Sequence, residues 1–171
     1  LDREAVTNLN AIDANTSRAA AFEEATRTAL AEANRIRDRT AAAKDTEGLG
    51  PADANLGMPR ERIEFGLKEA EADLAVANAR RSDLGRQLAY HENRPAAISQ
   101  RLAAGQEQQE TIAAALQAEL AGDEGLSLIQ AGRWAMETRY LALSTEIKAL
   151  DQELVSLPMR LELLAAKQDE E

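Results

Sequence analysis

The sequence of 171 residues contains no cysteine, and only 3% of its residues are aromatic. Without cysteine the chain has no disulfide framework and offers no thiolate for catalysis or metal binding. Valine occurs only at Val6, Val76 and Val155, so the bulky residues that fill sheets are scarce. A β-sandwich and an α/β sheet are therefore poorly supported.

Basic charge and long apolar runs are also lacking. The chain has 20 Lys and Arg against 30 Asp and Glu, a net charge of −10. Because nucleic-acid binding begins with neutralising phosphates, we expect no nucleic-acid partner, and anionic lipid surfaces repel the chain for the same reason. No run approaches 18 consecutive apolar residues, so we expect no membrane span. The start, Leu1-Asp2-Arg3-Glu4, favours a piece of a longer protein.

Alanine, leucine, glutamate and arginine dominate the composition, which is typical of long helices and coiled coils. Clusters of glycine and proline mark the breaks between helices, and Pro95 suits the first position of a helix. The sequence predicts an all-α, elongated, antiparallel, coiled-coil-like bundle of three to four long helices in one domain. The expected elements of residues 1–171 are a helix 2–44, a loop 45–59, helices 60–92 and 95–121, a turn 122–126, and a helix 127–168 kinked near Pro158.

Each expected helix carries an apolar seam, a row of residues at alternating steps of three and four that faces a partner helix. The row of helix 2–44 is mostly alanine, so this helix depends most on its partners. Short turns make the last three helices antiparallel neighbours, with helix 2–44 laid along them or extending away. The predicted seam residues are Ile12, Ala19, Phe22, Ala29, Ala33, Ile36 and Ala43, with Leu9 and Leu30 at the edge; Ile63, Leu67, Ala70, Leu74, Ala77, Arg81, Leu84, Leu88 and His91; Ile98, Leu102, Gly105, Gln109, Ile112 and Leu116; and Ile129, Arg133, Met136, Tyr140, Leu143, Ile147, Leu150, Leu154, Leu157, Leu161 and Leu164.

No catalytic, cofactor-binding or metal-binding residue is predicted, and we expect no cofactor, no enzyme activity and no small-molecule substrate. A metal site needs several ligands, and the single histidine, His91 next to Glu92, is expected to be packed or half-exposed at a helix end. Pairs of carboxylates on one helix face, Glu69 with Asp73 and Glu146 with Glu153, are expected to point to water rather than into an acid–base cleft. Asn15-Thr16-Ser17 matches a glycosylation acceptor by pattern only.

Two arginines and two apolar residues leave alternatives open. Arg81 and Arg133 fall on seams, as residues paired to a carboxylate that set the register or, preferably, as side chains that reach out to water. Trp134 and Leu141 are seven residues apart and lie off the main seam. They are expected to cover helix 2–44, and the alternative is an exposed contact patch.

Three stretches resemble the periplasmic helical "porin" domain of large MscS-type mechanosensitive channels (the MscK/MscM-like branch). They run from Leu67 to Leu74 and into Asn93-Arg94-Pro95, from Leu141 to Pro158, and from Arg160 to Asp169. The resemblance implies an extramembrane domain in the periplasm, tethered to the bacterial inner membrane in the full-length protein. It also implies partners: the remainder of the channel, envelope proteins, and further copies through a pore domain outside this chain.

The resemblance thus implies a domain of a mechanosensitive channel for ion transport, which modulates gating or contacts envelope components. The alternative is a coiled-coil scaffold or adaptor unrelated to a channel. For packing, Leu150→Asp is expected to loosen the bundle and Glu146→Lys to be tolerated, because only Leu150 lies on the predicted seam.

Overall fold

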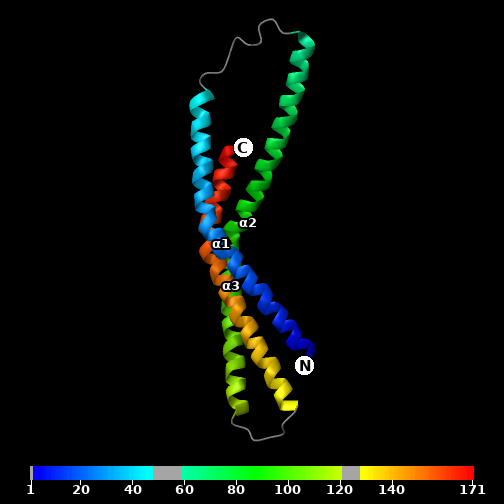
Figure 1. The fold of residues 1–171 in the computed structure, drawn as a ribbon, viewed down its shortest axis with the longest axis vertical. Helices are drawn as coiled ribbons and strands as arrows, with labels where there is room; N and C mark the ends of the chain where they lie inside the picture. The colour runs from blue at the N-terminus through cyan, green and yellow to red at the C-terminus, as the bar shows by residue number, and fades with distance from the viewer. Residues whose placement is uncertain (1, 48–58, 121–127) are drawn as a thin grey trace. The chain divides into compact units, whose positions relative to one another are not determined.

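A computed structural model describes residues 2–47, 59–120 and 128–171 of the chain, and they form three long α-helices (Figure 1). Helix α1 is Asp2–Glu47, α2 is Arg60–Leu120 and α3 is Leu128–Glu170. No strand occurs in these residues, so the predicted all-α bundle is confirmed. Of the predicted connections, residues 48–58 and the turn 122–126 lie outside the described part of the chain, while residues 45–47 belong to α1.

The expected break at residues 93–95 is absent, because α2 is one helix that contains Pro95. Proline is common at the first helical position, which is why the sequence favoured a new helix there. Inside a helix, proline lacks the N–H that normally donates to the carbonyl four residues earlier, and its cost there is about 3 kcal/mol. Contacts between α3 and two residues near Pro95 offset this cost. Arg94 is hydrogen-bonded to Glu153, and Ile98 is fully buried.

Helix α3 also runs through a proline, Pro158, as the continuous phase of its predicted seam suggested. The seam residues on both sides, Leu157 and Leu161, remain buried or half-buried. The bend expected between Leu154 and Leu157 stays a prediction.

The three helices form two compact units, and each helix contributes a segment to each. Unit 1 consists of Leu1–Arg27 and Asn93–Pro158, and unit 2 of Thr28–Glu92 and Met159–Glu171. Both helix prolines lie at the limits of these segments: Pro95 near the start of the α2 segment of unit 1, and Pro158 at the end of its α3 segment. The prediction of a single domain over residues 1–171 stays a prediction.

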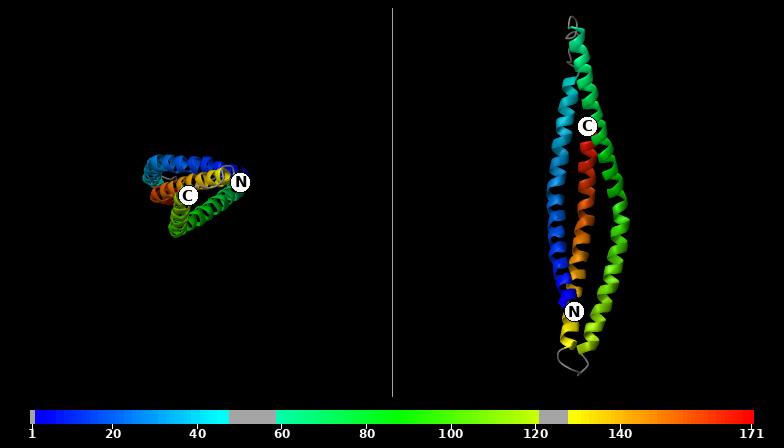
Figure 2. Two further views of the ribbon diagram at one scale, coloured as in Figure 1. Left: turned by 90° about the horizontal axis from the view of Figure 1, so that it is seen from below. Right: turned by 90° about the vertical axis from the view of Figure 1, so that its right-hand side faces the viewer.

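In unit 1, α1 and α3 run in the same direction (Figure 2). Two asparagines of α1 are hydrogen-bonded to α3. The side-chain amide of Asn8 donates to the carbonyl of Ala135, and that of Asn15 to the carbonyl of Ala142, both at 3.4 Å. Each pair is separated by 127 residues in sequence, so the two helices stay in register over a heptad.

Helix α2 runs antiparallel to α3 in unit 1 and packs on it through the largest apolar cluster there. Ile98 of α2 is fully buried against Leu150 and Leu157 of α3, with Leu102 and Leu154 at the edge of the cluster. All five were predicted seam residues. The predicted seams of residues 98–116 and 136–164 are therefore confirmed, because large apolar side chains dominate both; the side chain of Ile129 lies outside the described part.

In unit 2, α1 and α3 meet through smaller side chains. Ala33 and Ile36 of α1 are buried against Ala166 of α3, and Leu163 packs at the side. On the other side of α3, Gly85 of α2 lies so close that a Cβ there would be 3.7 Å from the side-chain amide of Gln168.

Several predicted seam positions are exposed, and they share a cause: no helix of the described structure covers them. Ala43 lies near the end of α1, and Ile63, Leu67 and Leu74 lie near the start of α2. The spacing of apolar residues indicates which face of a helix is suited to packing, but not which of these residues a neighbouring helix covers.

Candidate functional site

The carboxylate of Glu153 is the most buried charged group among the described residues, and it contacts both neighbouring helices of unit 1. Arg94 of α2 donates to it twice, from Nε at 2.6 Å and from Nη2 at 3.1 Å. Arg18 of α1 lies 3.6 Å away. Only 6% of the Glu153 side chain is exposed, against 27% for Arg94. A buried carboxylate is stable only with such charge-assisted bonds, so Glu153 holds three helices together.

A second arginine–glutamate pair with two hydrogen bonds joins α2 and α3, one heptad further along α2. Arg101 donates to Glu146 from Nε at 2.6 Å and from Nη2 at 2.9 Å. The hydrogen bond and the negative charge of Glu146 raise the pKa of Arg101 above its ordinary value. This pair is more exposed than Arg94–Glu153, so it contributes less to stability and more to alignment.

The expectation that Glu146 and Glu153 point to water is therefore wrong, because both are paired with arginines of α2. The tolerance of Glu146→Lys stays a prediction. Both acids lie beside the apolar seam rather than on it, where a side chain can reach either solvent or a basic residue of the next helix. The sequence holds the signal that was missed: Arg94 and Arg101 are separated by seven residues, as are the two acids. The other carboxylate pair, on α2, is exposed as expected.

The buried asparagines of α1 were also missed. Asn8 and Asn15 are only 6% and 9% exposed, and Asn8 bonds to Thr138 at 3.2 Å as well as to the backbone of α3. Continuing the alternating steps of three and four from Ile12 reaches both asparagines. A search for apolar residues passes over them, although a polar residue on a seam is a known device for setting register.

The burial of Asn15 also bears on the pattern Asn15-Thr16-Ser17. Its side-chain nitrogen, the atom to which a glycan would be attached, donates to α3. Thr16 donates its hydroxyl to the carbonyl of Ile12 within α1. A chance match explains the pattern, as the sequence suggested.

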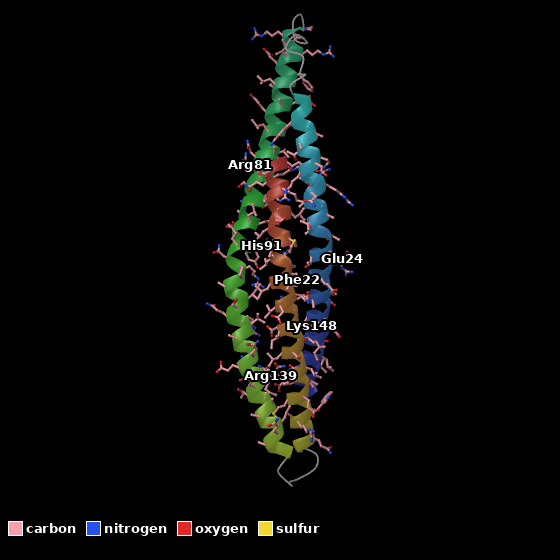
Figure 3. All side chains as sticks on the ribbon, turned by 90° about the vertical axis from the view of Figure 1, so that its left-hand side faces the viewer. Phe22, Glu24, Arg81, His91, Arg139 and Lys148 are labelled. Atoms are coloured by element: carbon pink, nitrogen blue, oxygen red, sulfur yellow. The ribbon has the colours of Figure 1, made fainter. Side chains whose placement is uncertain are left out.

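His91 of α2 is half-buried and lies on the side of the helix that faces α3 (Figure 3). Its Nε2 is 3.2 Å from Nη2 of Arg160, and the ring of Tyr90 meets it edge-on. The expectation of a packed or half-exposed imidazole is confirmed, but its expected place at a helix end is wrong, because α2 continues without a break past His91 to Leu120. Within residues 2–47, 59–120 and 128–171, no three potential ligands are grouped in a way that could hold a metal ion.

The remaining residues singled out in the sequence lie on the surface. Arg133 pairs with Glu137 of its own helix at 2.8 Å, and Arg81 is exposed. Trp134 is 45% exposed and Leu141 53%, so the expectation that they cover α1 is wrong. The alternative, an exposed patch, describes these two residues better.

Unit 2 is tied by ion pairs that are more exposed than Glu153. Each of these ion pairs contributes roughly 0–1 kcal/mol to the free energy of unfolding, so apolar contacts supply most of the stability of this unit. A groove of about 430 Å³ between α1 and α3 has mixed charges and contains no set of residues arranged for acid–base chemistry. The ion pairs are Arg37–Glu162, Arg39–Glu170, Lys167–Glu32 and Arg80–Glu171.

None of the three helices, over the residues that the structure describes, has the length and hydrophobicity needed to span a membrane. The family model of the mechanosensitive ion channel porin domain matches residues 3–171. No curated protein and no solved structure matches the chain.

Proposed function

This chain belongs to the mechanosensitive ion channel porin domain family, and we propose that it is a periplasmic, extramembrane domain that adjusts the gating of its channel. The observation that carries the proposal is the family match, which extends over nearly the whole chain and makes it part of a mechanosensitive channel. We place the domain in the periplasm, tethered to a bacterial inner membrane. We further propose that copies of the channel assemble through the pore domain.

The proposed role is mechanical and involves no catalysis. In unit 1, Glu153 bonds to Arg94 of α2 and lies near Arg18 of α1, so sliding either helix along α3 separates charges that are otherwise compensated. Leaving a buried ion without its partner costs about 3–5 kcal/mol. A bundle held in this way resists shear between its helices, which is what a lever or collar at a channel mouth requires.

Such a domain changes gating only if it interacts differently with the closed and the open channel. The first test is the full-length channel lacking residues 2–169, studied in membrane patches under graded suction. We expect the tension threshold to shift. An unchanged threshold would reject the regulatory role.

A pair of point variants in the full-length channel tests the mechanical role more sharply. Glu153→Gln removes the charge that joins the helices, and Asp151→Asn removes an exposed charge two residues away on the same helix. We expect the first to move the threshold and the second to leave it in place. Equal thresholds for both variants would mean that stiffness at Glu153 does not enter gating.

The location is tested separately by fusing reporters to this domain in the full-length protein. A phosphatase that is active only after export should be active, and a fluorescent protein that matures only in the cytoplasm should be dark. The opposite pattern would place the domain on the cytoplasmic side. The alternative of a scaffold unrelated to any channel is not supported by the family match.

A further inference from the structure

His91 of α2 and Arg160 of α3 form a contact within unit 2 that requires one protonation state of the histidine. Nε2 of His91 lies 3.2 Å from Nη2 of Arg160. A guanidinium group has donors but no acceptor and keeps its proton, so Nε2 must be the acceptor. Only a neutral imidazole with its hydrogen on Nδ1 can accept there. The contact in the structure therefore belongs to the neutral form of His91.

Both side chains are half-buried, and part of each lies away from water. Nδ1 of His91 and Nη1 of Arg160 are buried atoms. The ring of Tyr90 meets the imidazole edge-on, with 5.2 Å between the ring centroids, and limits its rotation. A positive charge on His91 would thus be only partly hydrated and would lie beside the guanidinium group. Both effects disfavour the protonated imidazole.

The other charged groups on the three helices have partners of their own or face solvent. On α2, Arg94 lies three residues after His91 and is bonded to Glu153, while Glu92 is exposed. The residues of α1 that are buried in unit 2 are uncharged; they are Ala29, Ala33 and Ile36. Four acids of α1 and α3 in unit 2 are paired with other cations, as Glu32–Lys167, Glu162–Arg37, Glu170–Arg39 and Glu171–Arg80.

Acid therefore shifts the folding equilibrium in one direction. A histidine in an unfolded chain takes up a proton as the pH falls through about 6.5. In the folded chain, His91 must give up its bond to Arg160 before it can carry a charge. The unfolded chain consequently binds more protons than the folded chain in this range, and stability falls with pH. The contribution of the contact is complete above about pH 6.5 and is lost below it.

We propose that the His91–Arg160 contact is a pH-sensitive switch within unit 2, which loosens α2 from α3 when His91 is protonated. Protonation removes the acceptor that Arg160 uses and places two positive charges side by side. His91 is the one histidine of the 171 residues, and the chain has no cysteine. Because histidine is the side chain that ordinarily titrates between pH 5 and 8, His91 dominates the response of the side chains in that range. The inference does not depend on the role of the domain in gating.

The first test is urea unfolding of the 171-residue chain at about pH 7.5 and about pH 5.0, compared with His91→Gln. The glutamine carbonyl can still accept from Arg160 but does not titrate. On going to the lower pH, we expect the unfolding equilibrium constant of the parent chain to rise about tenfold more than that of His91→Gln. The reason is that each proton taken up on unfolding changes this constant by up to about tenfold per pH unit.

Two arginines of α3 give a matched pair of variants. Arg160→Gln removes the charge beside His91, whereas Arg139→Gln removes an exposed charge elsewhere on the same helix. We expect Arg160→Gln to reduce the loss of stability in acid and Arg139→Gln to retain the full loss. Circular dichroism at about pH 7.5 verifies that both variants keep their helices.

A measurement on the folded chain locates the effect and does not depend on the stability of any variant at residue 91 or 160. Spin labels are attached to cysteines introduced at Ser82 of α2 and Asp169 of α3, which are exposed positions of unit 2. We expect the distribution of label distances in the parent chain to broaden when the pH is lowered from about 7.5 to about 5.0, across the range in which histidine titrates.

Three results would overturn the proposal. The first is an acid response of His91→Gln as large as that of the parent chain, which would assign the response to other groups. The second is an equal response of Arg160→Gln and Arg139→Gln, which would mean that the charge of Arg160 is not involved. The third is a label distribution in unit 2 that is the same at both pH values.

Discussion

Arg94 on α2 and Glu153 on α3 meet through two parallel hydrogen bonds, of 2.6 and 3.1 Å, in the interior of unit 1. The two side chains come from helices that are joined by a connection of few residues, and the pair lies beside the apolar cluster around Ile98. The contact therefore fixes both the spacing and the axial alignment of α2 on α3.

Replacing Glu153 with leucine should lower the free energy of unfolding by about 3–5 kcal/mol, because Arg94 keeps its charge in a largely buried place. Denaturant titration of the chain measures the loss. Glu162→Leu is the matched control, since Glu162 is 46% exposed and lies 3.6 Å from its partner Arg37; it should cost less than about 1 kcal/mol. If Arg94→Leu fails to recover part of the loss in the double variant, the stranded charge is not its cause.

Two leucines of α3 test the packing of unit 1. Leu150 is 4% exposed and Leu141 is 53% exposed. Leu150→Ala should cost about 2–4 kcal/mol, because it opens a cavity beside Ile98 and Leu157, whereas Leu141→Ala should stay within about 0.5 kcal/mol. Thermal and denaturant unfolding report both values. Similar losses at the two sites would contradict the orientation of α3.

Asn15→Ala should destabilise the chain by about 1 kcal/mol, because it removes the bond to the carbonyl of Ala142. It should also loosen the register between α1 and α3. Because the chain has no cysteine, spin labels can be attached to cysteines introduced at Ala20 and Lys148, which line one groove of unit 1. We expect a broader distribution of label distances in the variant, and a distribution as narrow as the parent's would argue against a register role.

Two helix glycines should respond differently to alanine. A Cβ at Gly132 meets no atom within 4 Å, so Gly132→Ala should stabilise the chain by about 1 kcal/mol through helix propensity alone. A Cβ at Gly105 would lie 3.4 Å from Cγ1 of Ile147, so part of the same gain is lost to crowding. The measurement is the difference in unfolding free energy, and a larger gain at Gly105 would contradict the close approach of the two helices there.

The large apolar side chains made much of this fold predictable. Ile98, Leu150 and Leu157 recur at the spacing of a helix seam, and all three are in the core. The all-α class and the family resemblance followed from such patterns, and the family match bears out the resemblance. Helix ends were less predictable, since Pro95 is compatible with both the start of a helix and, given strong packing on each side, its interior.

The polar members of the interfaces were the main omission. Asn8, Asn15 and Glu153 are buried, yet each belongs to a residue type that lies on the surface in most proteins. Their burial depends on a specific acceptor or cation contributed by a helix more than 50 residues away, such as Ala135 or Arg94. Local periodicity does not contain that information, although the recurrence of the same residue type after seven positions hints at it.

The spacing of Asn8 and Asn15 has a mechanical consequence. If α1 moved along α3 by one or two residues, both amides would leave the carbonyls to which they now donate. The next position at which Asn8 meets the carbonyl now used by Asn15 is one heptad away, about 10 Å along the axis. We therefore expect axial displacement between these two helices to meet a barrier, because both amides must give up their present bonds before the next matching position is reached.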